Sequence, residues 1–150
     1  MRPRMKIGLI VGVIGLVLNV CVSTFMGVCG PFLTLIAGAV AGFIAAGQEK
    51  LPNKGEGARA GAVSGAVTGG LMLIGQALGG IGALVFIQQS GTNPIFGTVP
   101  SPSADLSQQI MYYGTGLVTG LCFGVVGAAL AALTGAGGGY LGTSGQPVTR

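Results

Sequence analysis

The chain has 150 residues, of which 50% are hydrophobic and only 7% are charged, and its seven basic and three acidic side chains give a net charge of +4. A water-soluble domain of this length needs a much larger share of charged surface, so this class of protein is excluded. Glycine accounts for 31 residues but shows no collagen repeat and is mixed with Val, Leu, Ile and Ala, which excludes a triple helix and a disordered linker. Long charge-free apolar runs containing small residues predict an integral membrane protein.

The first expected membrane span is residues 7–26, a run without charge that follows Arg2, Arg4 and Lys6. A run of ~20 apolar residues is long enough to cross the hydrocarbon core of a bilayer. A basic start and an apolar run also describe a secretory signal peptide. However, this run is long for such a segment, and no site of the A-x-A type follows it in good register. We therefore expect an uncleaved first helix, with a cleaved signal as the alternative.

The second and third spans are expected at residues 31–47 and 60–88 and are joined by a polar turn at 48–59. Gly30 and Pro31 suit a helix end followed by a helix start, and Pro52 lies in the middle of the turn. The charge-free run of the third span is longer than one crossing needs. We expect the third helix to tilt, to break near Gly79 and Gly80, or to emerge from the bilayer.

The fourth span is expected at residues 109–134. The preceding segment, 90–107, has the composition of a loop because it is rich in proline and serine. A glycine-rich tail follows at 135–150. With four spans, all seven basic residues fall on one side of the membrane. The positive-inside rule then places the N- and C-termini in the cytoplasm. We expect the protein to lie in the inner membrane.

Small residues recur at every fourth position in three of the four spans, and this is the strongest motif of the chain. Lipid tails are as apolar as leucine, so membrane helices associate through close packing, which small residues allow. The rows either pack the protein's own helices or face another subunit, and the sequence leaves both open. The candidate helix-packing residues are Gly38, Gly42, Gly57, Gly61, Gly65, Gly69, Gly116, Gly120 and Gly124, and Ala58, Ala62, Ala66 and Gly70 form a second row beside the third-span glycines.

A few polar residues lie within the expected spans. They either form hydrogen bonds inside the bundle or line a narrow polar path through it. The candidates for such a path are Asn19, Ser64, Thr68, Gln76, Thr115 and Thr119.

The expected spans contain no ionisable residue apart from cysteine and tyrosine, and the chain has no histidine. Proton relays, ion-coupled carriers and voltage sensors require such groups within the membrane. Cys21, Cys29 and Cys122 make neither a metal site nor an activated nucleophile, although Cys21 and Cys29 either pair in a disulfide or remain free. We therefore expect no catalytic residue, metal or cofactor, and the basic charge is too sparse to indicate a dedicated lipid or nucleic-acid site.

The segment AGAVAGFIAAG, the polar turn and the restart GEGARAGAVSGAVTGGL resemble small glycine-rich prokaryotic membrane proteins of families without a known function. This resemblance covers roughly residues 29–80. It implies a bundle of about four helices and no activity.

The sequence thus predicts an all-α integral membrane bundle of four transmembrane helices packed through small-residue, GxxxG-type faces. The functional hypothesis is a non-catalytic structural or accessory subunit that docks by its glycine faces. The expected partners are membrane lipid and either other membrane subunits or copies of itself, with no nucleic acid and no small-molecule substrate. The alternative is a small homo-oligomeric pore or holin-like permeabiliser.

Overall fold

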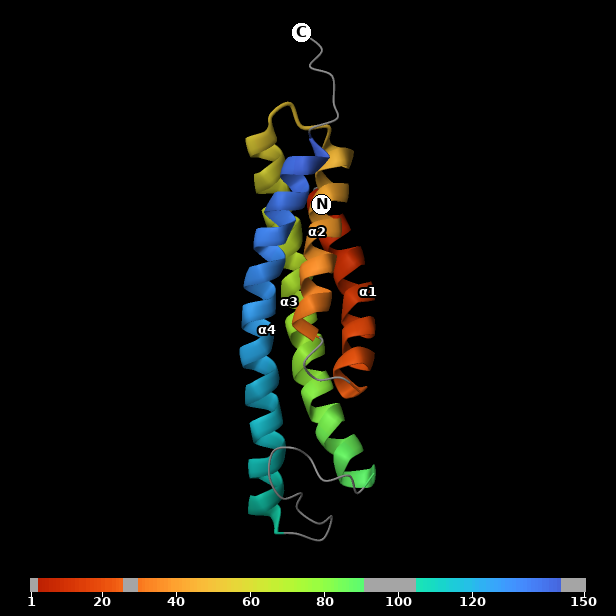
Figure 1. Ribbon diagram of the computed structural model, residues 1–150, viewed down its shortest axis with the longest axis vertical. Coiled ribbons are helices and arrows are strands. Elements are labelled where there is room, and N and C mark those ends of the chain that lie inside the picture. The colour runs from red at the N-terminus through yellow and green to blue at the C-terminus, as the bar shows by residue number, and fades with distance from the viewer. Residues whose placement is uncertain (1–2, 26–29, 91–104, 144–150) are drawn as a thin grey trace.

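The computed structural model describes residues 3–25, 30–90 and 105–143. These residues form an all-α bundle of four helices, each long and apolar enough to cross a membrane (Figure 1). The helices are α1 (Pro3–Phe25), α2 (Gly30–Glu49), α3 (Lys54–Ser90) and α4 (Leu106–Gly142).

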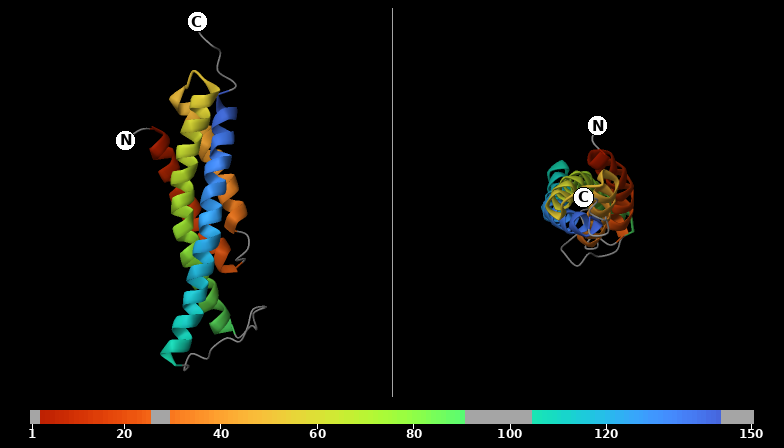
Figure 2. Two further views of the ribbon diagram at one scale, coloured as in Figure 1. Left: turned by 90° about the vertical axis from the view of Figure 1, so that its left-hand side faces the viewer. Right: turned by 90° about the horizontal axis from the view of Figure 1, so that it is seen from above.

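Helix α3 contacts each of the other three helices and makes the most extensive contacts, with α4 and with α1. Helix α2 also contacts α1 and α4, whereas α1 and α4 make no contact within the described ranges. Successive helices run antiparallel, so α1 is parallel to α3 and α2 is parallel to α4 (Figure 2). The bundle therefore consists of two hairpins packed side by side.

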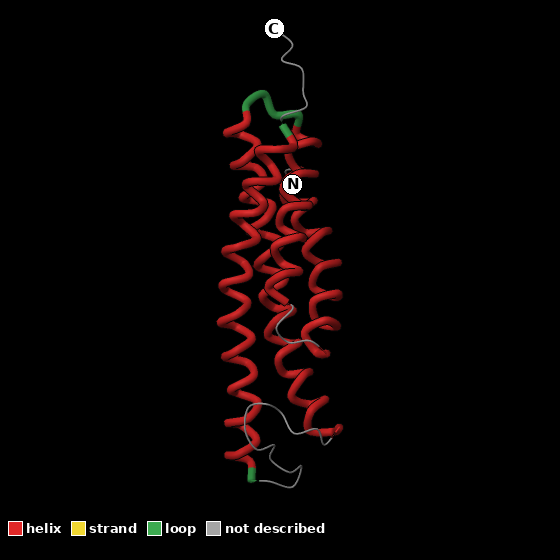
Figure 3. Tube along the Cα trace, viewed as in Figure 1, coloured by secondary structure: helices red, strands yellow, loops and turns green. Residues whose placement is uncertain are grey.

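The two hairpins differ in length. Helices α3 and α4 have 37 residues each, against 23 for α1 and 20 for α2. At 1.5 Å per residue, α3 and α4 are about 55 Å long and the other two about 30 to 35 Å. The C-terminal end of α3 and the N-terminal end of α4 consequently project beyond the α1–α2 hairpin (Figures 1 and 3). Of the three expectations for the third span, a break at Gly79 and Gly80 is not seen, because α3 is continuous through both residues.

The helix ends differ from the expected span ends. Helix α3 starts at Lys54, six residues before the expected span, because the turn after α2 is short. Lys50 adopts a left-handed conformation with φ 46° and ends α2. The Gly57 N–H then donates to the Asn53 carbonyl at 3.1 Å in the first turn of α3. Helix α4 continues through the expected glycine-rich tail to Gly142.

Compared with a soluble protein, this bundle buries small and polar residues and exposes large apolar ones. Glycine and alanine form most of the interior, and its largest fully buried side chains are Met72, Asn19, Thr34, Thr68 and Ser64. Large apolar side chains lie exposed on all four helices. Burial of small and polar groups, not of leucine and phenylalanine, therefore distinguishes the core.

Candidate functional site

The glycines at every fourth position of α3 face the backbone of α4. A Cβ atom added at Gly61 would collide with the carbonyl oxygen of Gly135, and one at Gly65 with the carbonyl oxygen of Ala131. A Cβ on Gly69 would lie 2.8 Å from the Cα atom of Ala128, and one on Gly57 would meet Thr143 and the Gly139 carbonyl. The helices approach so closely here that no side chain fits between them.

The three glycines of α4 that the sequence analysis proposed for helix packing, Gly116, Gly120 and Gly124, face α3. A Cβ on Gly120 would lie 2.8 Å from the Gln76 carbonyl oxygen, and one on Gly124 would lie 3.0 Å from the Leu73 Cγ atom. At Gly116 the nearest groups belong to Leu84 and Gly80. The two helices are thus in contact along most of their length.

Gly38 and Gly42 of α2 also face α4, through Ala131 and Gly135. Gly135 lies where three helices meet. A Cβ on it would be 2.5 Å from the Gly61 carbonyl oxygen and 3.3 Å from the Gly38 carbonyl oxygen. The central contact of the bundle therefore includes a residue that the sequence analysis assigned to the tail.

The second row of small residues on α3 is less buried than the first, and its first residue, Ala58, is half-buried. Ala66 and Gly70 are exposed, and a Cβ on Gly70 would meet nothing within 4 Å. Ala62 is half-buried, as are Ala132 and Ala136 on the neighbouring helix α4. The helical period places these residues on the side of the α3–α4 pair opposite α2. We call this surface, made of Ala62, Ala66, Gly70, Ala132 and Ala136, the outer small-residue face.

Four of the six polar candidates are buried on or against α3. Ser64 and Thr68 are fully buried, and their hydroxyls donate to the carbonyls of Ala41 in α2 at 3.2 Å and of Gly8 in α1 at 3.1 Å. The Asn19 side-chain amide donates from α1 to the Met72 carbonyl of α3 at 3.0 Å. These groups hydrogen-bond across helix contacts, as the first of the two sequence interpretations expects.

The remaining polar candidates behave differently. Gln76 is 3% exposed and packs against Gly30, yet its Nε2 atom has no hydrogen-bond partner among the described residues. Thr115 and Thr119 are exposed on α4, and the Thr115 hydroxyl donates to the Met111 carbonyl one turn earlier at 2.8 Å. The structure therefore does not place these two threonines beside the four buried polar candidates.

The two cysteines in the described ranges lie on α1 and α4, two helices that do not contact each other there. Cys21 and Cys122 are free and exposed, and Cys29, the other half of the proposed disulfide, lies outside the described residues. Within the described ranges, no cluster of His, Cys, Asp or Glu suits a metal ion.

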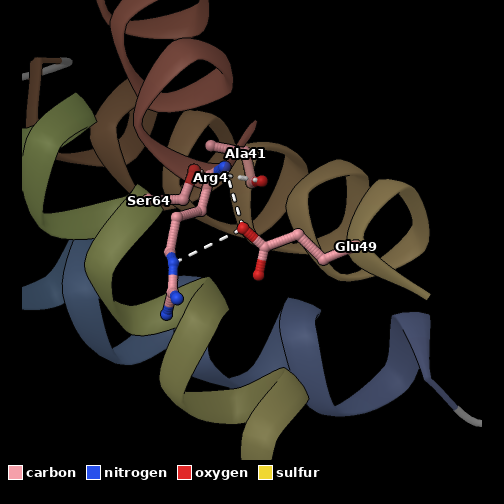
Figure 4. A network of polar contacts seen from close by, with 4 residues as sticks. All are labelled: Arg4, Ala41, Glu49 and Ser64. Carbon is pink, nitrogen blue, oxygen red and sulfur yellow. Dashed lines mark hydrogen bonds and ion pairs between the residues drawn. The ribbon is translucent and has the colours of Figure 1, made fainter. Parts of the chain in front are cut away.

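Charged residues from three helices meet at the end of the bundle where α1 begins. The Arg4 Nε atom lies 3.4 Å from the Glu49 Oε1 atom, which also accepts a hydrogen bond of 3.2 Å from the Arg4 backbone N–H (Figure 4). The Lys54 ammonium lies 5.0 Å from the centre of the Tyr140 ring, a cation–π distance. A cavity of about 580 Å³ opens at this end, lined by Arg4, Met5, Leu51, Glu56, Arg59 and Val63.

The chain matches no protein-family model, no curated protein and no solved structure. Its function is therefore inferred from the geometry described above.

Sequence reasoning missed the small residues that join α1 to α3. Added Cβ atoms at Gly8, Gly12 and Gly15 would meet Ser64, Leu71 and Met72, respectively. Their spacing of four and three residues is that of one helix face, so the pattern was available. The four-span topology predicted that the basic residues lie on one side of the membrane, but it did not predict that Arg4 and Arg59 line one cavity, because they are far apart in the sequence.

Proposed function

We propose that this protein crosses the inner membrane four times, with both termini in the cytoplasm. The exposed apolar surface of the bundle supports this. Ile36 is 63% exposed on α2, Val118 is 60% exposed on α4, and Ile10 is 58% exposed on α1. Exposure of apolar surface on every helix is unfavourable in water but favourable in the hydrocarbon core of a bilayer. All described basic side chains lie near the end at which α1 and α3 begin, as the positive-inside rule requires of a cytoplasmic side.

Within the membrane, the proposed role is that of a non-catalytic structural or accessory subunit that docks into a larger complex. The observation that carries this role is the difference between the two small-residue rows of α3. The inner row, represented by Gly61 and Gly65, faces the backbone of α4 in the same chain. The outer small-residue face has no such neighbour at Gly70. We therefore assign docking to the outer face and internal packing to the inner row.

A partner helix gains more from the outer small-residue face than lipid does. Small side chains let two backbones approach closely, which adds van der Waals contacts and weak cross-helix hydrogen bonds. Flexible acyl chains cover the same surface less closely. The partner is a transmembrane helix of a larger membrane subunit, and a second copy of this chain is the other occupant that the test distinguishes.

The pore alternative would use the six polar candidates, of which Ser64, Thr68 and Gln76 are buried on α3. In the structure the Ser64 and Thr68 hydroxyls are engaged with carbonyls of neighbouring helices, so they support packing more directly than a polar path. We accordingly expect no conductance when the purified protein is placed in liposomes.

A pair of double variants tests the docking proposal. Ala66→Leu with Gly70→Leu fills the outer face, and Gly61→Leu with Gly65→Leu fills the inner row. Val40→Leu adds bulk at an exposed position of α2 and serves as the control. Native-gel sizing after mild detergent extraction should show a larger species for the natural protein and for the control.

The outer-face variant should run as a folded, smaller species, because only the partner contact is lost. The inner-row variant should lose the folded chain itself. A larger species that persists in the outer-face variant would refute docking through this face. Mass spectrometry of the larger species separates a foreign subunit from a second copy.

A further inference from the structure

The cavity at the basic end is lined by both charged and apolar residues. Two arginines, Arg4 and Arg59, line it together with the apolar residues Met5, Leu51 and Val63. Its volume of about 580 Å³ is within the usual range for sites that hold a small molecule. The lining comes from α1, from α3 and from the turn between α2 and α3.

The polar part of this cavity suits a phosphate group. A guanidinium presents a planar fork of donors that matches phosphate oxygens. The ion pair of Arg4 with Glu49 runs through Nε, and Figure 4 shows the two terminal nitrogens of Arg4 beyond Nε, away from the carboxylate. The N-termini of α1 and α3 and the C-termini of α2 and α4 lie at this end, so the helix dipoles oppose one another and the attraction for an anion comes from the arginine side chains.

The apolar part suits the start of an acyl chain. Met5 is 40% exposed and Val63 is 39% exposed, so the side chains border the cavity without closing it. Met5 follows Arg4 directly in α1, and Val63 lies one turn after Arg59 in α3. An amphiphile with its phosphate at the arginines would therefore lay its chain along α1 and α3.

Glu56 distinguishes between phospholipid headgroups. Glu56 lines the same cavity, and an ionised carboxylate accepts hydrogen bonds but donates none. A glycerol hydroxyl or an ethanolamine ammonium can donate to it, whereas a choline group has no N–H or O–H. A carboxylate also disfavours a second bare anion beside the phosphate.

We propose that this cavity is a binding site for one glycerophospholipid whose headgroup carries a hydrogen-bond donor, with its phosphate held by Arg4 and Arg59 and its headgroup by Glu56. The proposal goes beyond the docking role but rests on the membrane insertion proposed above. The site belongs to the cytoplasmic leaflet and ties α1, α3 and the turn after α2 to the lipid surface.

The test is native mass spectrometry of the purified full chain in detergent, titrated in turn with phosphatidylglycerol, phosphatidylethanolamine and phosphatidylcholine of the same acyl chains. Phosphatidylglycerol and phosphatidylethanolamine should bind with one lipid per chain and at least about tenfold more tightly than phosphatidylcholine. Arg59→Gln and Arg4→Gln should each weaken binding of phosphatidylglycerol by about tenfold, the scale of one charge-assisted contact. Glu56→Gln should reduce the preference over phosphatidylcholine.

Lys6→Gln is the matched control, because it removes the same charge from α1 at an exposed residue that does not line the cavity. An equal loss of binding in this control would overturn the site in favour of diffuse attraction. Equal binding of all three lipids would also overturn it. Inorganic phosphate that competes with the lipid at equal concentration would identify a free-phosphate site and contradict the lipid assignment.

Two further readouts separate this proposal from the docking role. The Ala66→Leu, Gly70→Leu variant should bind phosphatidylglycerol normally even though it no longer assembles. If the natural protein assembles but binds the three lipids equally, only the lipid-site proposal is refuted and the docking proposal stands. Release of the natural protein from membranes by alkaline carbonate refutes the membrane insertion on which both proposals rest.

Discussion

At the scale of single residues, Gly135 shows how closely three helices of this bundle approach one another. A Cβ on it would lie 2.9 Å from the Gly65 Cα atom, whereas a Cβ on Gly137 in the same helix would meet nothing within 4 Å. The two positions have the same residue type and the same helix, and they differ only in their neighbours. Sequence spacing alone does not separate them, because both lie in one glycine-rich run.

This contrast gives a direct prediction. Gly135→Ala should lower the free energy of unfolding by about 1 to 3 kcal/mol, the usual cost of overpacking a close contact. Gly137→Ala should leave it unchanged or raise it by up to about 1 kcal/mol, because alanine favours a helix. Denaturation in detergent micelles, followed by circular dichroism, measures both. Equal effects of the two substitutions would contradict the placement of Gly135.

Lys50 carries backbone strain at the end of α2. Its φ of 46° lies in the left-handed region, which glycine adopts freely and lysine does not. Lys50→Gly should therefore raise the free energy of unfolding by about 0.5 to 1 kcal/mol. Gln48→Gly, inside the helix, should lower it by about 1 kcal/mol and serves as the opposite control. The same denaturation assay applies, and a loss of stability in Lys50→Gly would refute this description of the turn.

At the scale of elements, α1 depends on α3 for its place in the bundle. The Thr68 hydroxyl and the Asn19 amide each hydrogen-bond across this contact, and α1 makes no contact with α4 within the described ranges. The position of these polar residues on helices was predictable from the sequence. Their partners were not, because a carbonyl acceptor exists at every residue and the register between two helices is set by packing.

Thr68→Val keeps the shape of the side chain but removes its hydroxyl. It should weaken the attachment of α1 by about 0.6 kcal/mol, the mean value for hydrogen bonds between membrane helices. Thr119→Val makes the same change at an exposed position of α4 and should have no effect. Hydrogen exchange of the α1 amides measures the difference. Unchanged exchange in Thr68→Val would contradict a role for this bond in holding α1.

The element boundaries also show what a sequence can predict. The four apolar runs gave four helices, since length and hydropathy are properties of each run by itself. The end of α4 was not predictable, because the helix continues to Gly142 while Gly138 and Gly139 face Ala39 and Gly57 on other helices. Tertiary packing here overrides the poor helix propensity of glycine.

At the scale of the whole molecule, the proposed topology puts the two ends of α3 on opposite sides of the membrane. Lys54→Cys and Gln89→Cys test it in a chain whose natural cysteines are changed to serine. A membrane-impermeant maleimide added to cells with a permeable outer envelope should label Gln89→Cys directly and Lys54→Cys only after the inner membrane is opened. Labelling of both positions from the same side would refute a membrane-spanning α3.

The candidate sites were predictable to different degrees at this scale. The glycine rows depend on local spacing, so most of them could be found without a structure. The lipid cavity joins Arg4, Leu51 and Arg59, which only the hairpins and the parallel arrangement of α1 and α3 bring together. The small number of charged residues in the sequence therefore did not indicate that two arginines line one cavity in the fold.

The most direct test of the account is the composition of the species that mild detergent releases from the native membrane. Docking through the outer small-residue face predicts a stoichiometric complex much larger than the 14.7 kDa chain, which is reduced to the folded chain in the Ala66→Leu, Gly70→Leu variant. A natural protein that leaves the membrane as a single chain, with no partner and no second copy, would contradict it.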